Sequence, residues 1–135
     1  MRVRSLALAV LAAALALNST VTTRAQSTAK TTTATSAYER GLAAIRVGDL
    51  AKAQSELEQA AKLSPQNAEI QLSLGRVLLQ RSDVAGAVEH QRIATQLKPT
   101  SPQAHLNLGL ALLAGSQADD AIAELKEAAD RKSVV

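Results

Sequence analysis

The sequence predicts an all-α protein, a short solenoid of about six helices arranged as helix–turn–helix repeats. Several small residues, and the prolines, recur at an interval of 34 residues. Within each interval the apolar residues recur at helical spacing. The start of the chain follows neither pattern, because a short apolar run and a Ser/Thr-rich stretch precede the first repeat. We therefore expect the solenoid to come after a separate N-terminal segment.

Residues 1–25 are similar to a secretory signal peptide. Arg2 and Arg4 precede twelve apolar residues, Leu6 to Leu17, and a polar stretch then leads to Ala25. A positive start, a short apolar run and small residues at the exit are typical of such a peptide. We expect cleavage after Ala25, and export to the periplasm or out of the cell. The run is shorter than the about 20 residues that a membrane span needs. The alternative is an uncleaved membrane anchor or a packed helix.

Residues 26–36 are expected to form a flexible linker. Serine and threonine dominate this stretch, and no apolar period runs through it. Such a composition offers little apolar surface to bury, so it predicts a segment outside the packed array.

The remaining chain divides into three repeats, 34–67, 68–101 and 102–135. The columns that recur are Gly41, Gly75 and Gly109; Ala53, Ala87 and Ala121; Ala60, Ala94 and Ala128; Pro65 and Pro99; and Asp49 and Asp83. The glycine and alanine columns indicate where two antiparallel helices approach closely. The aspartates are expected to cap the second helix of a repeat, and the prolines to end it.

The second repeat shows the pattern most fully. Apolar residues follow helical spacing from Ile70 to Leu78, and Ser82-Asp83 then interrupts them. A second helical stretch runs from Val84 to Leu97, before Pro99. This period, with Leu74-Gly75, Ala87, Ala94 and Pro99 at their spacings, resembles the tetratricopeptide repeat. The resemblance covers all three repeats and implies a right-handed solenoid that binds other proteins.

The chain departs from the family pattern at two large core positions. Where the family often has tryptophan, this chain has Ala37, Gln71 and His105. Where it often has tyrosine, this chain has Ala44, Leu78 and Leu112. We therefore expect a thin core of leucine and alanine.

Charge and composition exclude several classes of function. Three of the 15 Lys and Arg residues lie in the first 25 positions, so 12 basic and 12 acidic residues remain beyond them. A neutral body lacks the positive surface that nucleic acids require. The chain contains no cysteine, which excludes disulfides and thiolate metal sites.

Neither a catalytic, a cofactor nor a metal site is expected, and the protein is not predicted to be an enzyme. Of the two histidines, His105 occupies a core position, and His90 is expected to be exposed without a metal-ligand partner. Glu56 and Glu58 point to different sides of a helix. Asp119 and its neighbour Asp120 fall in the first turn of the last helix, where carboxylates meet the helix dipole favourably.

The resemblance implies a concave groove lined by the first helix of each repeat. The groove residues expected on this basis are Tyr38, Leu42, Ile45, Leu72, Arg76, Leu79, Leu106, Leu110 and Leu113. All but Arg76 are apolar or aromatic, so an amphipathic helix or apolar peptide of a protein partner is predicted. Some family members hold a peptide's terminal carboxylate with Lys, Arg and Asn, and that set is absent here. The alternative is that these leucines pack against one another.

The third repeat raises a question about its outer face. Repeat arrays need a polar terminal cap, yet Leu108, Leu112, Ile122 and Leu125 are apolar and some of them should face outward. Either the protein associates with itself through this end, or the face is small enough to stay exposed. A third alternative is a fragment of a longer repeat protein. The main prediction is an exported protein-binding scaffold, and a self-assembling structural module is the second.

Overall fold

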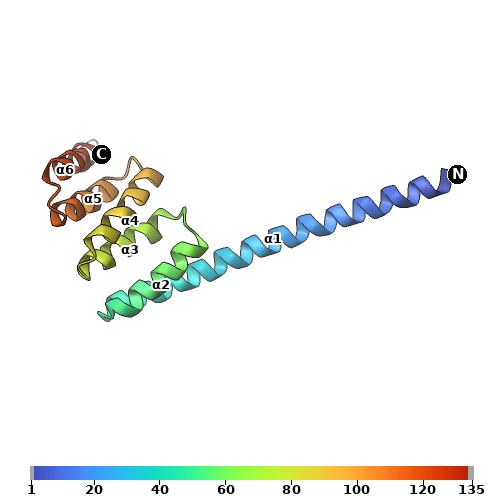
Figure 1. The fold of residues 1–135 in the computed structure, drawn as a ribbon, viewed down its shortest axis with the longest axis horizontal. Coiled ribbons are helices and arrows are strands. Elements are labelled where there is room, and N and C mark those ends of the chain that lie inside the picture. Colours follow the sequence, from blue (N-terminus) through green and yellow to red (C-terminus); the bar gives the residue numbers. More distant parts are fainter. Residues whose placement is uncertain (1, 134–135) are drawn as a thin grey trace. The chain divides into compact units, whose positions relative to one another are not determined.

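The computed structural model describes the backbone of residues 2–133 and the side chains of residues 22–133. Within this part the chain forms six helices, which Figure 1 shows in order. They are α1 (Arg2–Arg46), α2 (Leu50–Leu63), α3 (Ala68–Gln80), α4 (Val84–Leu97), α5 (Pro102–Ala114) and α6 (Ala118–Ser133). The all-α prediction is confirmed.

The chain divides into two compact units, residues 1–32 and 33–135. The first unit is helical from residue 2 onward and consists of the early part of α1. Most of the expected signal peptide lies outside the described side chains, so its cleavage and export stay predictions. None of the helices, over the residues that the structure describes, has the length and apolarity needed to cross a membrane.

The flexible linker expected over residues 26–36 is instead helical, as part of α1. The hydroxyl groups of Thr28, Thr31 and Thr32 donate hydrogen bonds to carbonyls three or four residues earlier, at 2.9–3.2 Å. These bonds satisfy the threonine side chains inside the helix. The segment also lacks glycine and proline, so nothing in it breaks the helix.

Each repeat is an antiparallel pair of helices that touch closely at the predicted glycines. A Cβ atom added to Gly109 of α5 would lie 2.7 Å from Cγ of Leu125 in α6. A Cβ on Gly41 would lie 2.8 Å from Cγ of Leu57 in α2. Only glycine therefore lets the two helices of a pair approach this far, which explains the recurring column.

The pairs stack on one another through a thin core of leucine, valine and alanine. α2 packs on α3, and α4 packs on α5. The largest buried cluster extends from Ala44 in α1 through Leu57, Leu74 and Val77 to Ala111 in α5. Because each residue is small, little apolar area is buried per residue. The continuous stack of three helix pairs therefore buries apolar area that a single pair could not bury alone.

The third repeat buries part of its apolar set. Leu108 and Leu112 lie in a cluster with Ala121, so they do not face outward. Leu125 is half-buried, and Ile122 is exposed. Of the four residues in question, Ile122 is thus the one that clearly points to solvent.

Polar side chains cap the helices at the predicted places. Asp49 accepts a hydrogen bond from the backbone N–H of Lys52, and Asp83 accepts one from Gly86, both at 3.0 Å. Asn67 and Ser101 cap the first helices of the second and third repeats in the same way. Each cap satisfies a backbone donor that has no partner inside the helix.

The turn inside each repeat uses one residue in the left-handed conformation. Gly48, Ser82 and Ser116 occupy this position, with φ of 78°, 66° and 60°. After it, the next backbone N–H donates to a carbonyl five residues earlier, as from Asp83 to Leu78 at 2.9 Å. The same bond follows Gly48 and Ser116. Two of the three turns therefore place a serine where glycine is favoured.

Replacing Ser82 or Ser116 by glycine should stabilise the protein. The left-handed conformation costs a non-glycine residue about 1–2 kcal/mol, and the greater freedom of unfolded glycine offsets part of this gain. We expect a net increase of about 0.5–1 kcal/mol per substitution in the free energy of unfolding, measured with urea. Gly48→Ala is the matched reverse change and should destabilise. This account of the turn would be wrong if neither serine-to-glycine change raised the free energy of unfolding, or if Gly48→Ala did not lower it.

Candidate protein-binding groove

The structure places the nine predicted groove residues in three different environments. Leu72 is only 6% exposed and packs with Ala94 and Ala104 between the second and third repeats. It therefore cannot line an open surface, and this part of the prediction is wrong. The burial of Leu72 depends on the neighbouring helix α5, which brings Ala104 against it, as well as on the face of α3 that carries it. The partly buried members are Tyr38, Leu42, Ile45 and Leu79, and the exposed ones are Arg76, Leu106, Leu110 and Leu113.

Three of the nine residues meet in one cavity between α3 and α5. Arg76, Leu79 and Leu110 line this space of about 160 Å³. The other lining residues, which were not predicted as groove residues, are Gln80, Gln91 and Asn107. Leu110 is 46% exposed, so the cavity has an open apolar edge. The arrangement joins apolar walls to a few polar groups, as in many peptide-binding clefts.

The polar groups of this cavity are held in place by the fold. The side-chain oxygen of Asn107 accepts a hydrogen bond from Gln103 at 2.7 Å, which fixes the orientation of its amide. Arg76 is exposed and brings a positive charge to the rim. Together they can hold an amide, a carbonyl or a single carboxylate of a ligand.

Gln91 is a buried polar residue that was not predicted to belong to the groove. Its amide nitrogen donates to the carbonyl of Leu72 at 3.2 Å, while its Oε1 atom has no hydrogen-bond partner. The equivalent positions hold Leu57 and Leu125. In the sequence, this residue could have been recognised because glutamine stands where the other two repeats have leucine. Its side chain adds a polar group to the lining of the cavity.

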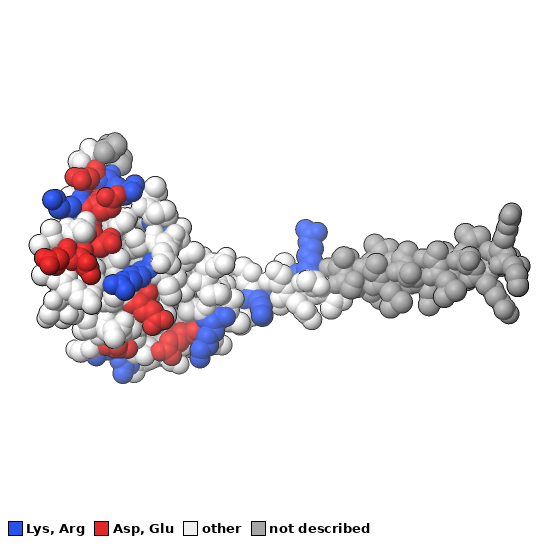
Figure 2. Space-filling model, turned by 45° about the horizontal axis from the view of Figure 1, so that its top comes forward, with Lys and Arg blue, Asp and Glu red and all other residues white. Residues whose placement is uncertain are grey.

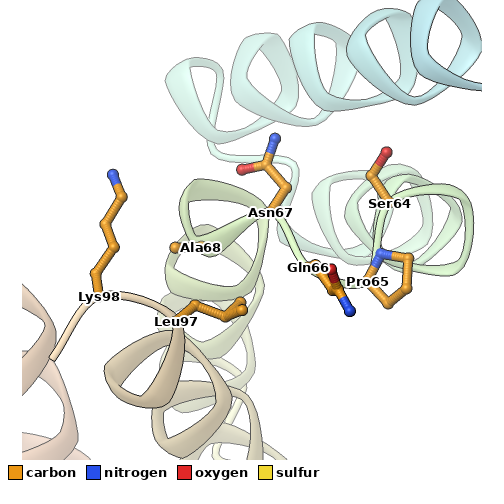
Figure 3. Close-up of a pocket in the computed structure, with 7 residues that line it drawn as sticks. All are labelled: Ser64, Pro65, Gln66, Asn67, Ala68, Leu97 and Lys98. Atoms are coloured by element: carbon orange, nitrogen blue, oxygen red, sulfur yellow. The ribbon is translucent and has the colours of Figure 1, made fainter. Parts of the chain in front are cut away.

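A wider depression lies away from the groove, at the turn between α2 and α3. Figure 3 shows Leu97 and Lys98, at the end of α4, beside the turn formed by residues 64–67. Its volume is about 570 Å³, and it is open and lined mostly by turn residues. Lys98 forms an exposed ion pair with Glu69 at its edge. Exposed ion pairs of this kind contribute little to stability.

Both histidines belong to packed polar contacts between helices. His90 is half-buried, and its Nδ1 lies 2.7 Å from the side-chain oxygen of Gln71, so the expectation of an exposed His90 is wrong. His105 is 8% exposed, as a core residue should be. In the part of the chain that the structure describes, no cluster of potential metal ligands is found.

His105 and Gln71 occupy equivalent positions and make equivalent bonds. Gln71 donates to the carbonyl of Pro65 at 2.8 Å, and His105 Nε2 lies 2.8 Å from the carbonyl of Pro99. The second nitrogen of His105, Nδ1, lies 2.6 Å from Glu124. Both neighbours are acceptors when Glu124 is ionised, so both ring nitrogens donate when the ring is protonated.

The surroundings of His105 raise its pKa above the ordinary value of 6.5. Burial acts to lower the pKa, but the bonds to Pro99 and Glu124 and the charges of Glu124 and Glu127 outweigh it. Glu56 and Glu58, two of the carboxylates singled out from the sequence, each have a separate partner. Glu56 pairs with Arg40 and Glu58 accepts from Gln54, so the two do not share a proton.

Charges of both signs are mixed over the repeat unit. In the view of Figure 2, Lys and Arg lie among Asp and Glu, and neither sign forms a continuous patch on that face. This matches the balance of 12 basic and 12 acidic residues expected beyond the first 25 positions.

Comparison with known families now identifies the architecture. The family model for the tetratricopeptide repeat matches residues 38–102 and 93–133, which together cover most of the chain. This chain belongs to the tetratricopeptide-repeat family. Its repeats form a scaffold for protein–protein interactions, a non-catalytic type of domain, so the prediction of a non-enzymatic module is confirmed.

Solved structures show the same fold. MamA shares 25% identity and a TM-score of 0.71, covering 76% of this chain and 60% of its own. The tetratricopeptide-repeat domain of Arabidopsis OM64 shares 20% identity, a TM-score of 0.73, and coverage of 78% and 88%. The first such domain of Spaghetti (RPAP3), bound to an HSP90 peptide, shares 16% identity, a TM-score of 0.73, and coverage of 76% and 82%. A comparison with curated protein sequences found no match.

The stability of this tetratricopeptide-repeat protein should depend on pH through His105. Because folding raises the pKa of the ring, its contribution is complete below the unfolded pKa of 6.5 and is lost as pH rises through the folded pKa. We expect the free energy of unfolding to fall with rising pH over this window, measured by urea titration.

His105→Gln is the matched control, because Gln71 shows that glutamine fits the equivalent site and reaches the same carbonyl. The variant should unfold with less pH dependence from pH 6 upward. Glu124→Gln should have a similar effect by removing the acceptor charge. Parent-like pH dependence in both variants would show that His105 does not carry the effect.

Proposed function

We propose that this protein is an exported adaptor that binds an apolar peptide or helix of a partner protein in the groove between α3 and α5. The observation that carries the proposal is the cavity where Leu79 and Leu110 stand beside Arg76 and Asn107. Family membership supports peptide binding in general. The structurally similar Spaghetti domain was solved bound to an HSP90 peptide, which supports peptide binding by this fold.

The residues of the groove favour a particular kind of ligand. Leu79 and Leu110 offer apolar contact, and Leu110 is 46% exposed. Arg76 is the one cation among the cavity residues, so a ligand with a single acid or carbonyl beside apolar side chains fits best. A strongly acidic peptide would find too few positive partners here. Burial of side chains, more than charge, would supply the affinity.

Leu110→Glu should weaken peptide binding about tenfold or more, because a buried leucine contributes about 1.5–3 kcal/mol. The peptide would be selected from a displayed random library on the immobilised protein, synthesised, and titrated calorimetrically against parent and variant. Leu97→Glu is the matched control, since Leu97 is also exposed but lies outside the groove.

The two variants distinguish binding in the groove from non-specific binding to exposed apolar residues. The proposal requires that Leu97→Glu binds like the parent and that both variants keep the parent's helical circular dichroism. Equal losses in the two variants, or a selected peptide that neither variant affects, would reject the groove.

Export is tested separately with a reporter. Residues 1–36 fused to alkaline phosphatase, which needs disulfides formed outside the cytoplasm, should give an active enzyme. Leu11→Arg should abolish activity, because a charge in the apolar run opposes insertion by about 2.5–3.5 kcal/mol. The exported product should begin at Gln26 by mass spectrometry. Activity that survives Leu11→Arg, or no activity in the parent fusion, would reject export through this segment.

A further inference from the structure

The end of the array formed by α5 and α6 exposes residues whose counterparts are covered in the earlier repeats. We define the distal face as Leu106, Leu113, Ile122, Leu125 and Ala129. Leu106 is 39% exposed, whereas its counterpart Leu72 is 6% exposed. Ile122 is 54% exposed, whereas its counterpart Val88 is half-buried and packs against two core clusters. A cavity of about 320 Å³ opens on this face, between Leu106 and Leu125.

The chain itself shows what this kind of face receives. In the first repeat the equivalent face is covered by α3, and in the second repeat by α5. Leu72, for example, is buried beneath Ala104 of α5. The distal face thus has the form of an inter-repeat contact, and an apolar helical surface is its physical complement.

The opposite end of the array does not offer such a surface. Where α3 and α5 carry the buried residues Leu74 and Leu108, α1 carries Arg40. Its guanidinium pairs with Glu56 at 2.8 Å and donates to Ser36 at 3.0 Å. Burying this polar network against leucine and isoleucine would cost desolvation without new partners. Head-to-tail stacking of copies, which would give open filaments, is therefore disfavoured.

We propose that the distal face pairs with the distal face of a second copy in a two-fold symmetric dimer. The charges on α6 fit this arrangement, because its first turn holds Asp119 and Asp120 and its last turn holds Arg131 and Lys132. A two-fold axis that passes near Leu125 and is perpendicular to α6 makes the two α6 helices antiparallel. Asp119 of one copy then lies toward Lys132 of the other, on both sides of the apolar centre. The pairing is closed, so assembly stops at two.

This dimer does not depend on the proposed groove. Leu110 is not part of the distal face, since its counterpart Arg76 is also exposed. Leu110→Glu should therefore impair peptide binding and leave the dimer intact. Failure of one proposal leaves the other standing.

Sedimentation equilibrium of the full chain tests the proposal. We expect a monomer–dimer equilibrium without larger species. Ile122→Glu should raise the dimer dissociation constant about 100-fold, since each dimer loses two buried side chains. Leu97→Glu adds the same charge at an exposed leucine outside the face and should not change the constant.

Charge reversal tests the orientation without replacing an apolar residue of the distal face. Asp119→Lys and Lys132→Asp should each weaken the dimer about tenfold, because two pairs at the rim become repulsive. The double reversal should restore the parent constant. Circular dichroism of each variant checks that the helices are kept.

Four outcomes would overturn the proposal. A parent that stays monomeric at high concentration would leave the face without a second copy. A dimer indifferent to Ile122→Glu would lie elsewhere on the protein. Species that keep growing with concentration, or a double reversal that does not restore the dimer, would rule out the two-fold arrangement.

Discussion

The fold depends on one constraint, which is that a helix pair in this chain can bury its apolar face only against the next pair. The side chains are too small for a self-contained core, because Leu57, Leu74 and Ala111 are buried through three successive repeats rather than within one. Close approach at Gly41 and Gly109 makes each pair thin enough for the stack to be continuous. Stability is therefore shared between neighbours, as the physics of linear repeats requires.

The polar contacts follow the same logic of linking neighbours. Gln71 and His105 each join the proline carbonyl at the end of the preceding repeat to the second helix of their own, through His90 and Glu124. One side chain thus fixes the angle at which a repeat joins the last. In the third repeat the residue at this position, His105, can itself carry a charge, whereas Gln71 is neutral. The same position has a neutral and an ionisable version within one chain.

Much of the architecture followed from the sequence, because period and helical spacing are local signals. The caps Asp49 and Asp83 and the glycine column were predicted and are present. Two features could not be foreseen. The left-handed turn at Ser82 carries no glycine to mark it. The burial of Leu72 depends on a helix that arrives 30 residues later, so helix-face reasoning could not separate groove from interface. The helix over residues 26–36 shows that a Ser/Thr-rich composition does not by itself stop a helix.

The two ends of the array differ in a way that bears on what the protein can assemble into. At the first repeat, Arg40 stands in the column of Leu74 and Leu108 and is held by Glu56, which makes that end hydrophilic. At the third repeat, Ile122 stands in the column of Gln54 and Val88. The outer position is therefore more apolar at the repeat where no neighbour in the described chain covers it. If this position only had to remain exposed to solvent, a polar residue such as the glutamine found at Gln54 would be expected there. One polar end and one apolar end restrict association to a single closed contact, and they leave the groove between α3 and α5 free to bind a ligand.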